Sequence, residues 1–115
     1  MPPNSAKGAL NYSEILQCAA ACRFTDHARR EMETEPFGAI QVDEVVGALQ
    51  AGEIIERYLQ DRPYPSCLVL GRTANGRPLH IVCAPVLTEH KLIIVTVYQP
   101  DPARWDAEFK GRNEG

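Results

Sequence analysis

The chain of 115 residues has no hydrophobic run of the length that a membrane-spanning helix needs. Such a helix takes about 18 consecutive apolar residues, and the segment 1–9 also lacks the apolar core of a secretory signal. We therefore expect a cytoplasmic protein. In a reducing compartment, free and mostly buried thiols are expected in place of a disulfide framework. This applies to all four cysteines: Cys18, Cys22, Cys67 and Cys83.

The sequence also lacks an excess of positive charge, because 12 basic side chains face 15 acidic ones and the net charge is −3. A protein that coats nucleic acid over its whole surface carries the opposite sign, so any nucleic-acid site must be a local patch. The length is that of one domain. We predict a single domain over residues 12–109, with flexible tails at 1–11 and 110–115.

Several sequence motifs of common enzymes are absent. The chain has no phosphate-binding glycine loop, no Gly-x-Ser-x-Gly turn, no paired His-Glu zinc helix and no dinucleotide fingerprint. We expect no cofactor. Cys18 and Cys22 stand one helical turn apart ahead of His27, but this spacing is not the Cys-x-x-Cys of zinc knuckles. Packing inside an alanine-rich helix is the favoured interpretation, and no metal site is predicted.

Periodicity and capping residues predict an α+β domain. Helices are expected at Tyr12–Cys22, at Thr25–Glu33 and at Val42–Leu49, the last ending before Gly52. Runs rich in β-branched and aromatic residues then predict four strands, at 54–59, 66–73, 78–84 and 92–98. A short capped helix is expected at Pro100–Phe109. The N-terminal helices should pack on a four-stranded antiparallel meander.

The dipeptide Asn75-Gly76 between two apolar runs favours a two-residue hairpin turn flanked by Ala74 and Arg77. This turn sets the predicted register, in which Leu68 lies opposite Cys83, Gly71 opposite His80 and Leu70 opposite Ile81. Cys67 and Cys83 would then point to opposite faces of the sheet, so no disulfide between them is expected.

No acidic residue occurs from Arg62 through Thr88, a stretch that contains Arg72, Arg77 and His80. Such a patch suits a phosphate-bearing partner. The alternative is that these arginines pair with acidic residues of a neighbouring strand. Tyrosines and arginines could also form a face for RNA bases and phosphates, or only pack at a rim. That face would comprise Tyr58, Tyr64, Tyr98, Arg57 and Arg72.

Two histidines are candidates for acid–base chemistry. His80 stands within a strand, where it is either a hydrogen-bonded core residue or a group that faces a ligand across from Gly71. His27 lies in the first turn of a predicted helix, whose dipole disfavours the imidazolium, which suits a neutral base or an ordinary surface residue. His90 lies in a polar turn and is expected to be solvated.

Six segments together carry a family resemblance, namely HARREM at 27–32, GEIIE at 52–56, PYPSCL at 63–68, LGR at 70–72, RPLH at 77–80 and VYQPD at 97–101. They closely resemble the bacterial Domain of Unknown Function 4258 family over residues 12–109. The resemblance implies a RelE-like ribonuclease-toxin fold and a zinc-finger antitoxin-like partner. The family positions that would share a cleft correspond to His27, Tyr64, Ser66, Arg72 and His80. Many members have arginine where this chain has Glu31, with Arg30 one position earlier.

These inferences lead to the hypothesis of a toxin-like, metal-independent endoribonuclease or an RNA-binding relative. His80 or His27 would act as base, the other histidine or Tyr64 as acid, and Arg72 would stabilise the charge of the transition state. The candidate substrate-binding residues are Arg30, Arg57, Tyr58, Arg62, Ser66, Arg77 and Tyr98. The alternative is a non-catalytic protein-binding module that uses the same face, or accepts a strand at its sheet edge.

Overall fold

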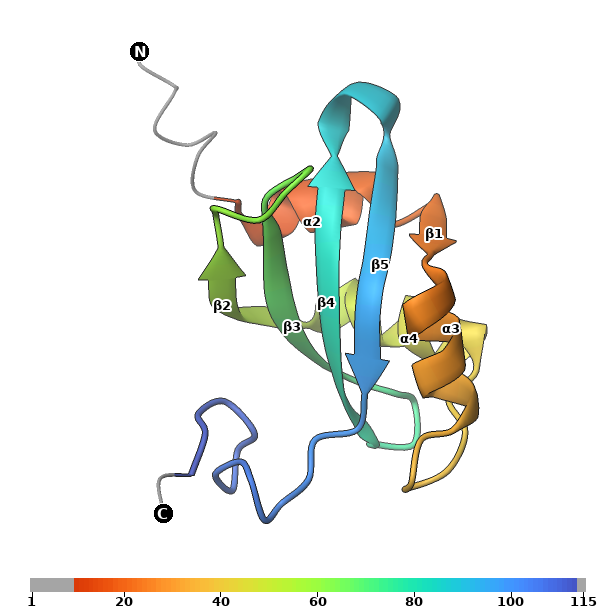
Figure 1. Ribbon diagram of the computed structural model, residues 1–115, viewed down its shortest axis with the longest axis vertical. Helices are drawn as coiled ribbons and strands as arrows, with labels where there is room; N and C mark the ends of the chain where they lie inside the picture. The colour runs from red at the N-terminus through yellow and green to blue at the C-terminus, as the bar shows by residue number, and fades with distance from the viewer. Residues whose placement is uncertain (1–9, 114–115) are drawn as a thin grey trace.

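The computed structural model describes residues 10–113, so residues 1–9 of the predicted N-terminal tail and residues 114–115 of the predicted C-terminal tail lie outside the described part. Within residues 10–113, three α-helices precede most of the sheet: α2 (Tyr12–Cys18), α3 (Asp26–Glu33) and α4 (Val42–Ala48) (Figure 1). The strands are β1 (Cys22–Phe24), β2 (Glu53–Tyr58), β3 (Ser66–Arg72), β4 (Pro78–Val86) and β5 (Lys91–Tyr98). Short 3-10 helices, η1 (Leu49–Ala51) and η2 (Leu87–Glu89), follow α4 and β4. None of the helices within residues 10–113 is long and apolar enough to cross a membrane.

The strands form one mixed sheet in the order β1-β5-β4-β3-β2, with β1 parallel to β5 and the other pairs antiparallel. The α+β prediction is confirmed, but a four-stranded antiparallel meander is wrong. The predicted first helix ends at Cys18, and Cys22 belongs to β1. The reason is the edge of β5: Cys22 pairs with Leu92, and the Leu92 amide donates to the Ala21 carbonyl at 2.9 Å.

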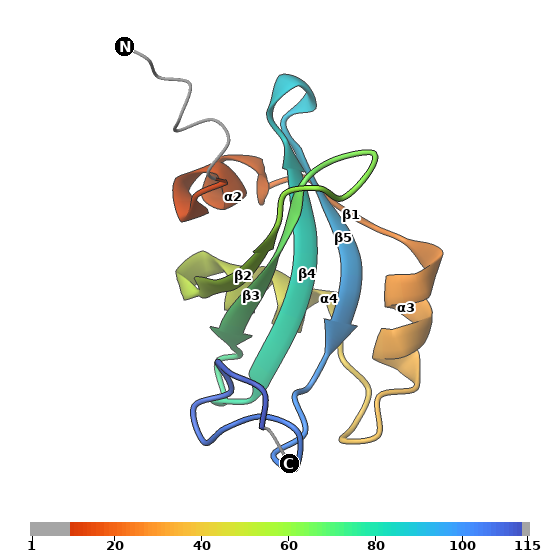
Figure 2. The same cartoon turned by 60° about the vertical axis from the view of Figure 1, so that its left-hand side comes forward.

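Helices α2 and α4 cover one face of the sheet, and Figure 2 shows both on the same side. Ile15, Val45 and Leu49 are fully buried there with the inward residues of the strands. Gly71 allows the close approach of α4, because a Cβ on Gly71 would stand 2.5 Å from the carbonyl oxygen of Ala48. We call the opposite side of the sheet the open face.

The register aligns two rows of side chains on the open face. One row comprises Glu56, Leu68, Val82 and Thr96, and the other comprises Glu53, Leu70, His80 and Tyr98. Residues 100–113, which we call the strap, cross the lower part of this face (Figures 1 and 2). Three polar residues of these rows contact the strap: Glu56 pairs with Arg112, Glu53 with Lys110, and His80 with Phe109.

The β3–β4 hairpin differs from the prediction by one residue. The Thr73 amide donates to the Arg77 carbonyl at 2.9 Å, and the Gly76 amide donates to the Thr73 carbonyl at 2.8 Å. The turn is thus a three-residue loop in which Gly76 has φ +85°, a conformation that glycine adopts readily. The predicted register is wrong: Leu70 pairs with His80, Gly71 with Leu79, and Cys67 with Cys83.

The helix predicted at Pro100–Phe109 is not formed, and the strap is a series of turns. Two aspartates compete successfully for the backbone amides that a helix would need. Asp101 Oδ1 accepts from the Ala103 amide at 2.9 Å, and the Asp106 carboxylate accepts from the amides of Glu108, Lys110 and Gly111 at 3.0–3.1 Å. A bridge between Trp105 and Arg112 then folds the strap back on itself.

Beyond β1, helix α3 and its flanks occupy the outer edge of β5. Glu31 Oε1 accepts from the Val97 amide, and Glu35 Oε1 accepts from the Gln99 amide, both at 3.1 Å. Thr25 caps α3 by accepting from the Ala28 amide and donates to the Val95 carbonyl at 3.2 Å. Side chains thus satisfy backbone groups that an added strand would use.

Candidate functional site

His80 is fully buried and both of its ring nitrogens have partners. Nε2 lies 2.8 Å from the Phe109 carbonyl oxygen, and Nδ1 lies 3.1 Å from the Tyr98 hydroxyl. A carbonyl only accepts, so Nε2 carries the proton and Nδ1 accepts from Tyr98. Burial lowers the pKa of the imidazole, which keeps it neutral. Trp105 packs edge-on against the ring at 4.3 Å. His80 therefore ties the strap to the sheet.

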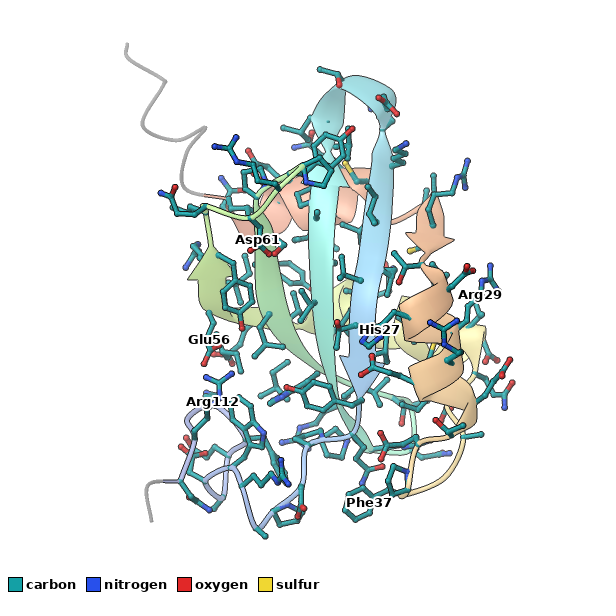
Figure 3. All side chains as sticks on the ribbon, in the orientation of Figure 1. His27, Arg29, Phe37, Glu56, Asp61 and Arg112 are labelled. Carbon is teal, nitrogen blue, oxygen red and sulfur yellow. The ribbon has the colours of Figure 1, made fainter. Side chains whose placement is uncertain are left out.

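A second set of polar contacts joins the strap to β2. Arg112 forms an ion pair with Glu56, and Figure 3 shows the two side chains pointing toward one another. Tyr58, two residues along the same strand, donates its hydroxyl to the other oxygen of Glu56 at 2.5 Å. The Arg112 guanidinium also lies 4.6 Å from the centre of the Trp105 ring. We call Glu56, Tyr58 and Arg112 the carboxylate cluster.

The carboxylate cluster holds its groups in defined protonation states. Burial disfavours ionisation of Glu56, but the hydrogen bonds from Tyr58 and Arg112 outweigh it and lower the pKa of the carboxyl. Burial together with the Glu56 carboxylate raises the pKa of Tyr58 to about 12. Glu56 is thus an anion beside a protonated phenol and a cation. The side chains of Glu56 and Arg112 are 24% and 59% exposed, so solvent reaches both.

An open groove of about 780 Å³ lies beside the cluster, between the strap and the residues that follow α3. Phe37, which is 49% exposed, stands on one side, and Trp105 and Tyr98 line the other parts. We call it the aromatic groove. Its lining residues are Glu35, Pro36, Phe37, Tyr98, Gln99, Asp101, Ala103, Arg104, Trp105, Arg112 and Asn113. Three aromatic rings and two arginines thus share one concave surface.

The residues that the sequence assigned to one cleft are dispersed. His27 is exposed on α3, where its Nε2 lies 3.4 Å from Glu31. Tyr64 lines a different, apolar groove of about 500 Å³ that also contains Leu59 and Leu87. Ser66 is buried and donates to Asp61 at 2.5 Å. Of the two predicted histidines, only His80 lies on the open face.

The predicted arginines also have separate roles. Arg77 donates to the carbonyl of Gly38, to that of Ala39 at 3.1 Å and to Gln99 at 2.7 Å, which holds the α3–α4 loop to the hairpin. Arg57 donates to the Leu10 carbonyl at 3.0 Å. Arg72 lies 5.9 Å from the centre of the Phe109 ring of the strap. Arg30 and Arg62 are exposed.

The prediction did not include Glu56, Trp105 or Arg112 among the site residues. The alternation of Glu56 and Tyr58 on one strand is a signal that could have placed both on one face. Arg112 had no such signal, because its partner stands 56 residues earlier in the sequence. Among residues 10–113, no group of three or more His, Cys, Asp and Glu side chains could hold a metal ion.

A family model described as Domain of unknown function (DUF4258) matches residues 24–99, which is more than half of the chain. The chain belongs to this family. The DUF4258 region includes Glu56, Tyr58, His80 and Tyr98 but ends before the strap, which supplies Trp105 and Arg112. No curated protein and no solved structure is similar enough to the chain to count as a match.

Proposed function

We propose that this chain binds single-stranded RNA in the aromatic groove and cleaves it at the carboxylate cluster, as a toxin-like endoribonuclease. A relation to RelE-like toxins and a zinc-finger antitoxin-like partner belong to the same proposal. The observation that carries it is the contact of Glu56, Tyr58 and Arg112 beside the aromatic groove. A base, an acid and a cation for phosphoryl transfer thus stand together, and the reaction requires no metal ion.

The groove suits RNA better than a compact anion. Unpaired bases stack on aromatic side chains, and arginines contact the phosphates between them. Phe37 offers an exposed ring to the groove, and Tyr98 also lines it. Arg104 is exposed, and Arg112 reaches from the groove to Glu56. A phosphate held by Arg112 would therefore stand next to the Glu56 carboxylate.

The proposed reaction is attack of the ribose 2′-hydroxyl on the adjacent phosphorus. The Glu56 carboxylate takes the 2′-hydroxyl proton while the new P–O bond forms. Tyr58 gives its proton to the 5′-oxygen as the P–O5′ bond breaks, which leaves a 2′,3′-cyclic phosphate and a 5′-hydroxyl. Glu56 then returns a proton to Tyr58 along their 2.5 Å hydrogen bond. Arg112 stabilises the charge that develops on phosphorus.

This assignment changes the roles expected from the sequence. His80 is fully buried with both nitrogens engaged, so it cannot exchange a proton with RNA in this conformation. It acts instead as a positioning residue that holds Tyr98 and the strap. His27, 60% exposed on α3, has no contact with the carboxylate cluster among the described residues.

The test is cleavage of a labelled single-stranded RNA by the purified chain in the presence of EDTA, with matched variants. Glu56→Gln should lower the rate about 100-fold or more, the usual contribution of a general base. Glu53→Gln is the control, since Glu53 lies on the same face of β2 and pairs with Lys110 of the strap. Equal rates for the two variants, or no cleavage by the folded wild-type chain, would contradict the proposal.

The second candidate is a non-catalytic protein-binding module, which the apolar groove favours. Leu59 and Leu87 are 45% and 40% exposed at that groove, which suits an apolar segment of a protein partner. The two functions differ in salt dependence. RNA binding through several phosphates weakens steeply as salt rises, whereas binding at an apolar interface does not.

A further inference from the structure

Two buried thiols face each other across the β3–β4 hairpin. Cys67 and Cys83 are register partners on adjacent antiparallel strands, and both are fully buried as free thiols. Directly opposed residues of such strands have Cα atoms about 4.5–5.5 Å apart. Disulfides usually join Cα atoms about 4.4–6.8 Å apart. The strands therefore already hold these two residues at a separation that a disulfide accepts.

The pairing is specific to these two cysteines. Cys22 lies opposite Leu92, and its sulfur contacts the Ala19 carbonyl oxygen at 3.4 Å. Cys18 is buried on α2. Neither of these has a cysteine as its register partner, whereas Cys67 and Cys83 are each other's partner.

We propose that Cys67 and Cys83 form an oxidation site, at which a small peroxide produces a reversible cross-strand disulfide. The proposal is independent of the proposed ribonuclease activity, because it concerns the helix-covered face of the sheet and not the open face. The small size of hydrogen peroxide matters, since both sulfurs have no exposed surface and a bulky oxidant would have to enter the core.

The two sulfurs differ in reactivity, which sets the order of events. The hydrogen bond from Cys83 lowers the pKa of Cys67, and burial opposes this only in part. The same hydrogen bond and burial raise the pKa of Cys83. Cys67 is therefore the sulfur that more readily becomes the thiolate nucleophile.

The reaction balances with one peroxide. The Cys67 thiolate attacks one oxygen of hydrogen peroxide, the O–O bond breaks, and the departing hydroxide takes a proton to become water. The resulting Cys67 sulfenic acid is attacked by the Cys83 sulfur, so that the S–S bond forms and the S–O bond breaks. A second water leaves. The two thiols lose two electrons and two protons in total, and the peroxide is reduced to two waters.

The experiment treats the folded full-length chain with hydrogen peroxide, blocks remaining thiols after denaturation, and measures the intact mass. The expected result is the loss of two hydrogens and alkylation of only two cysteines. Trypsin cleaves after Arg72, between the two residues, so a disulfide should appear as two linked peptides that separate on reduction. Cys22→Ala should retain the product, and Cys83→Ala should lose it.

The wild-type digest tests the proposal even when a variant folds poorly. Four alkylated cysteines after treatment, a bridge that includes Cys18 or Cys22, or a gain of oxygen in place of the loss of two hydrogens would each overturn it. The reversible product must also disappear on addition of a thiol reductant, and a mass change that persists under reduction refutes the disulfide.

Discussion

Replacing His80 by alanine should destabilise the chain, because the imidazole joins the sheet to the strap. The ring fills a site with no exposed surface, packs against Trp105 at 4.3 Å and hydrogen-bonds with Tyr98 and Phe109. Truncation of a buried side chain of this size costs about 2–5 kcal/mol. Tyr98 and Phe109 are only half-buried, so water can replace part of the lost hydrogen bonding. The expected loss is about 3 kcal/mol.

Thermal unfolding followed by circular dichroism measures this loss. A domain of about 100 residues loses roughly 4 °C per kcal/mol, so Tm should fall by about 12 °C. His27→Ala is the matched control, because His27 is 60% exposed and its contact with Glu31 is a helix-surface pair worth about 0.5 kcal/mol or less. If the Tm of His80→Ala equals that of His27→Ala and of the wild type, the imidazole does not anchor the strap and the packing argument is refuted.

Three further predictions concern the pH dependence of stability, the contact between α4 and the sheet, and Arg77. Burial lowers the pKa of His80 in the folded chain, so the imidazole of the unfolded chain binds a proton at a higher pH, near the ordinary value of 6.5. The free energy of unfolding should therefore be highest above that pH and decline as pH falls below it. Urea titrations at several pH values should show this decline in the wild type but not in His80→Gln, and equal declines would exclude His80 as its source. Gly71→Ala should cost about 3 kcal/mol, since its Cβ meets the Ala48 carbonyl. Gly47→Ala, with nothing within 4 Å of its Cβ, should increase the free energy of unfolding by roughly 0.5–1 kcal/mol. A urea midpoint of Gly71→Ala that equals or exceeds that of Gly47→Ala would contradict the helix–sheet contact. Arg77→Ala should cost about 2 kcal/mol through its lost hydrogen bonds. The salt dependence of its RNA affinity, measured by fluorescence anisotropy under conditions where it is folded, should equal that of the wild type, because Arg77 is engaged with Ala39 and Gln99 and contacts no phosphate; a shallower dependence would assign Arg77 to the phosphate contacts.

Local signals in the sequence were sufficient for much of the fold. The second helix was expected to begin at Thr25, and Thr25 accepts from the Ala28 amide as the N-cap of α3. The strand at 92–98 was found because β-branched residues occupy it, and β5 covers Lys91–Tyr98. These elements are set by backbone preferences of residues close in the sequence, so one chain is enough to find them.

The dipeptide Asn75-Gly76 does not by itself determine the register of the β3–β4 hairpin. A two-residue turn and a three-residue loop with Gly76 in the left-handed region both suit this dipeptide. In the structure Thr73 favours the longer loop, because its hydroxyl oxygen accepts from the Arg77 amide at 3.1 Å. A loop longer by one residue gives every residue of β4 a different partner on β3, so that Cys83 pairs with Cys67 and not with Leu68.

The candidate site could be predicted only in part, because it depends on contacts between distant segments. Glu56 and Arg112 are 56 residues apart, and the strap that joins them is irregular. Its turns arise from Asp101 and Asp106, whose helix-capping character also fits the helix predicted there. Tertiary contacts with His80 and Glu56 decide between the two conformations, and a local pattern does not contain them.

The side chains along the outer edge of β5 also limit how copies of the chain can associate. A fibre that grows by strand pairing needs an accessible strand on both sides of each sheet. On one side β1 is three residues long, and Glu31, Glu35 and Thr25 occupy the backbone groups beyond it. On the other side β2 is the edge strand. Pairing of β2 with β2 joins identical surfaces and closes as a two-fold dimer. Strand pairing at β2 would therefore end at two copies and would not extend into a fibre.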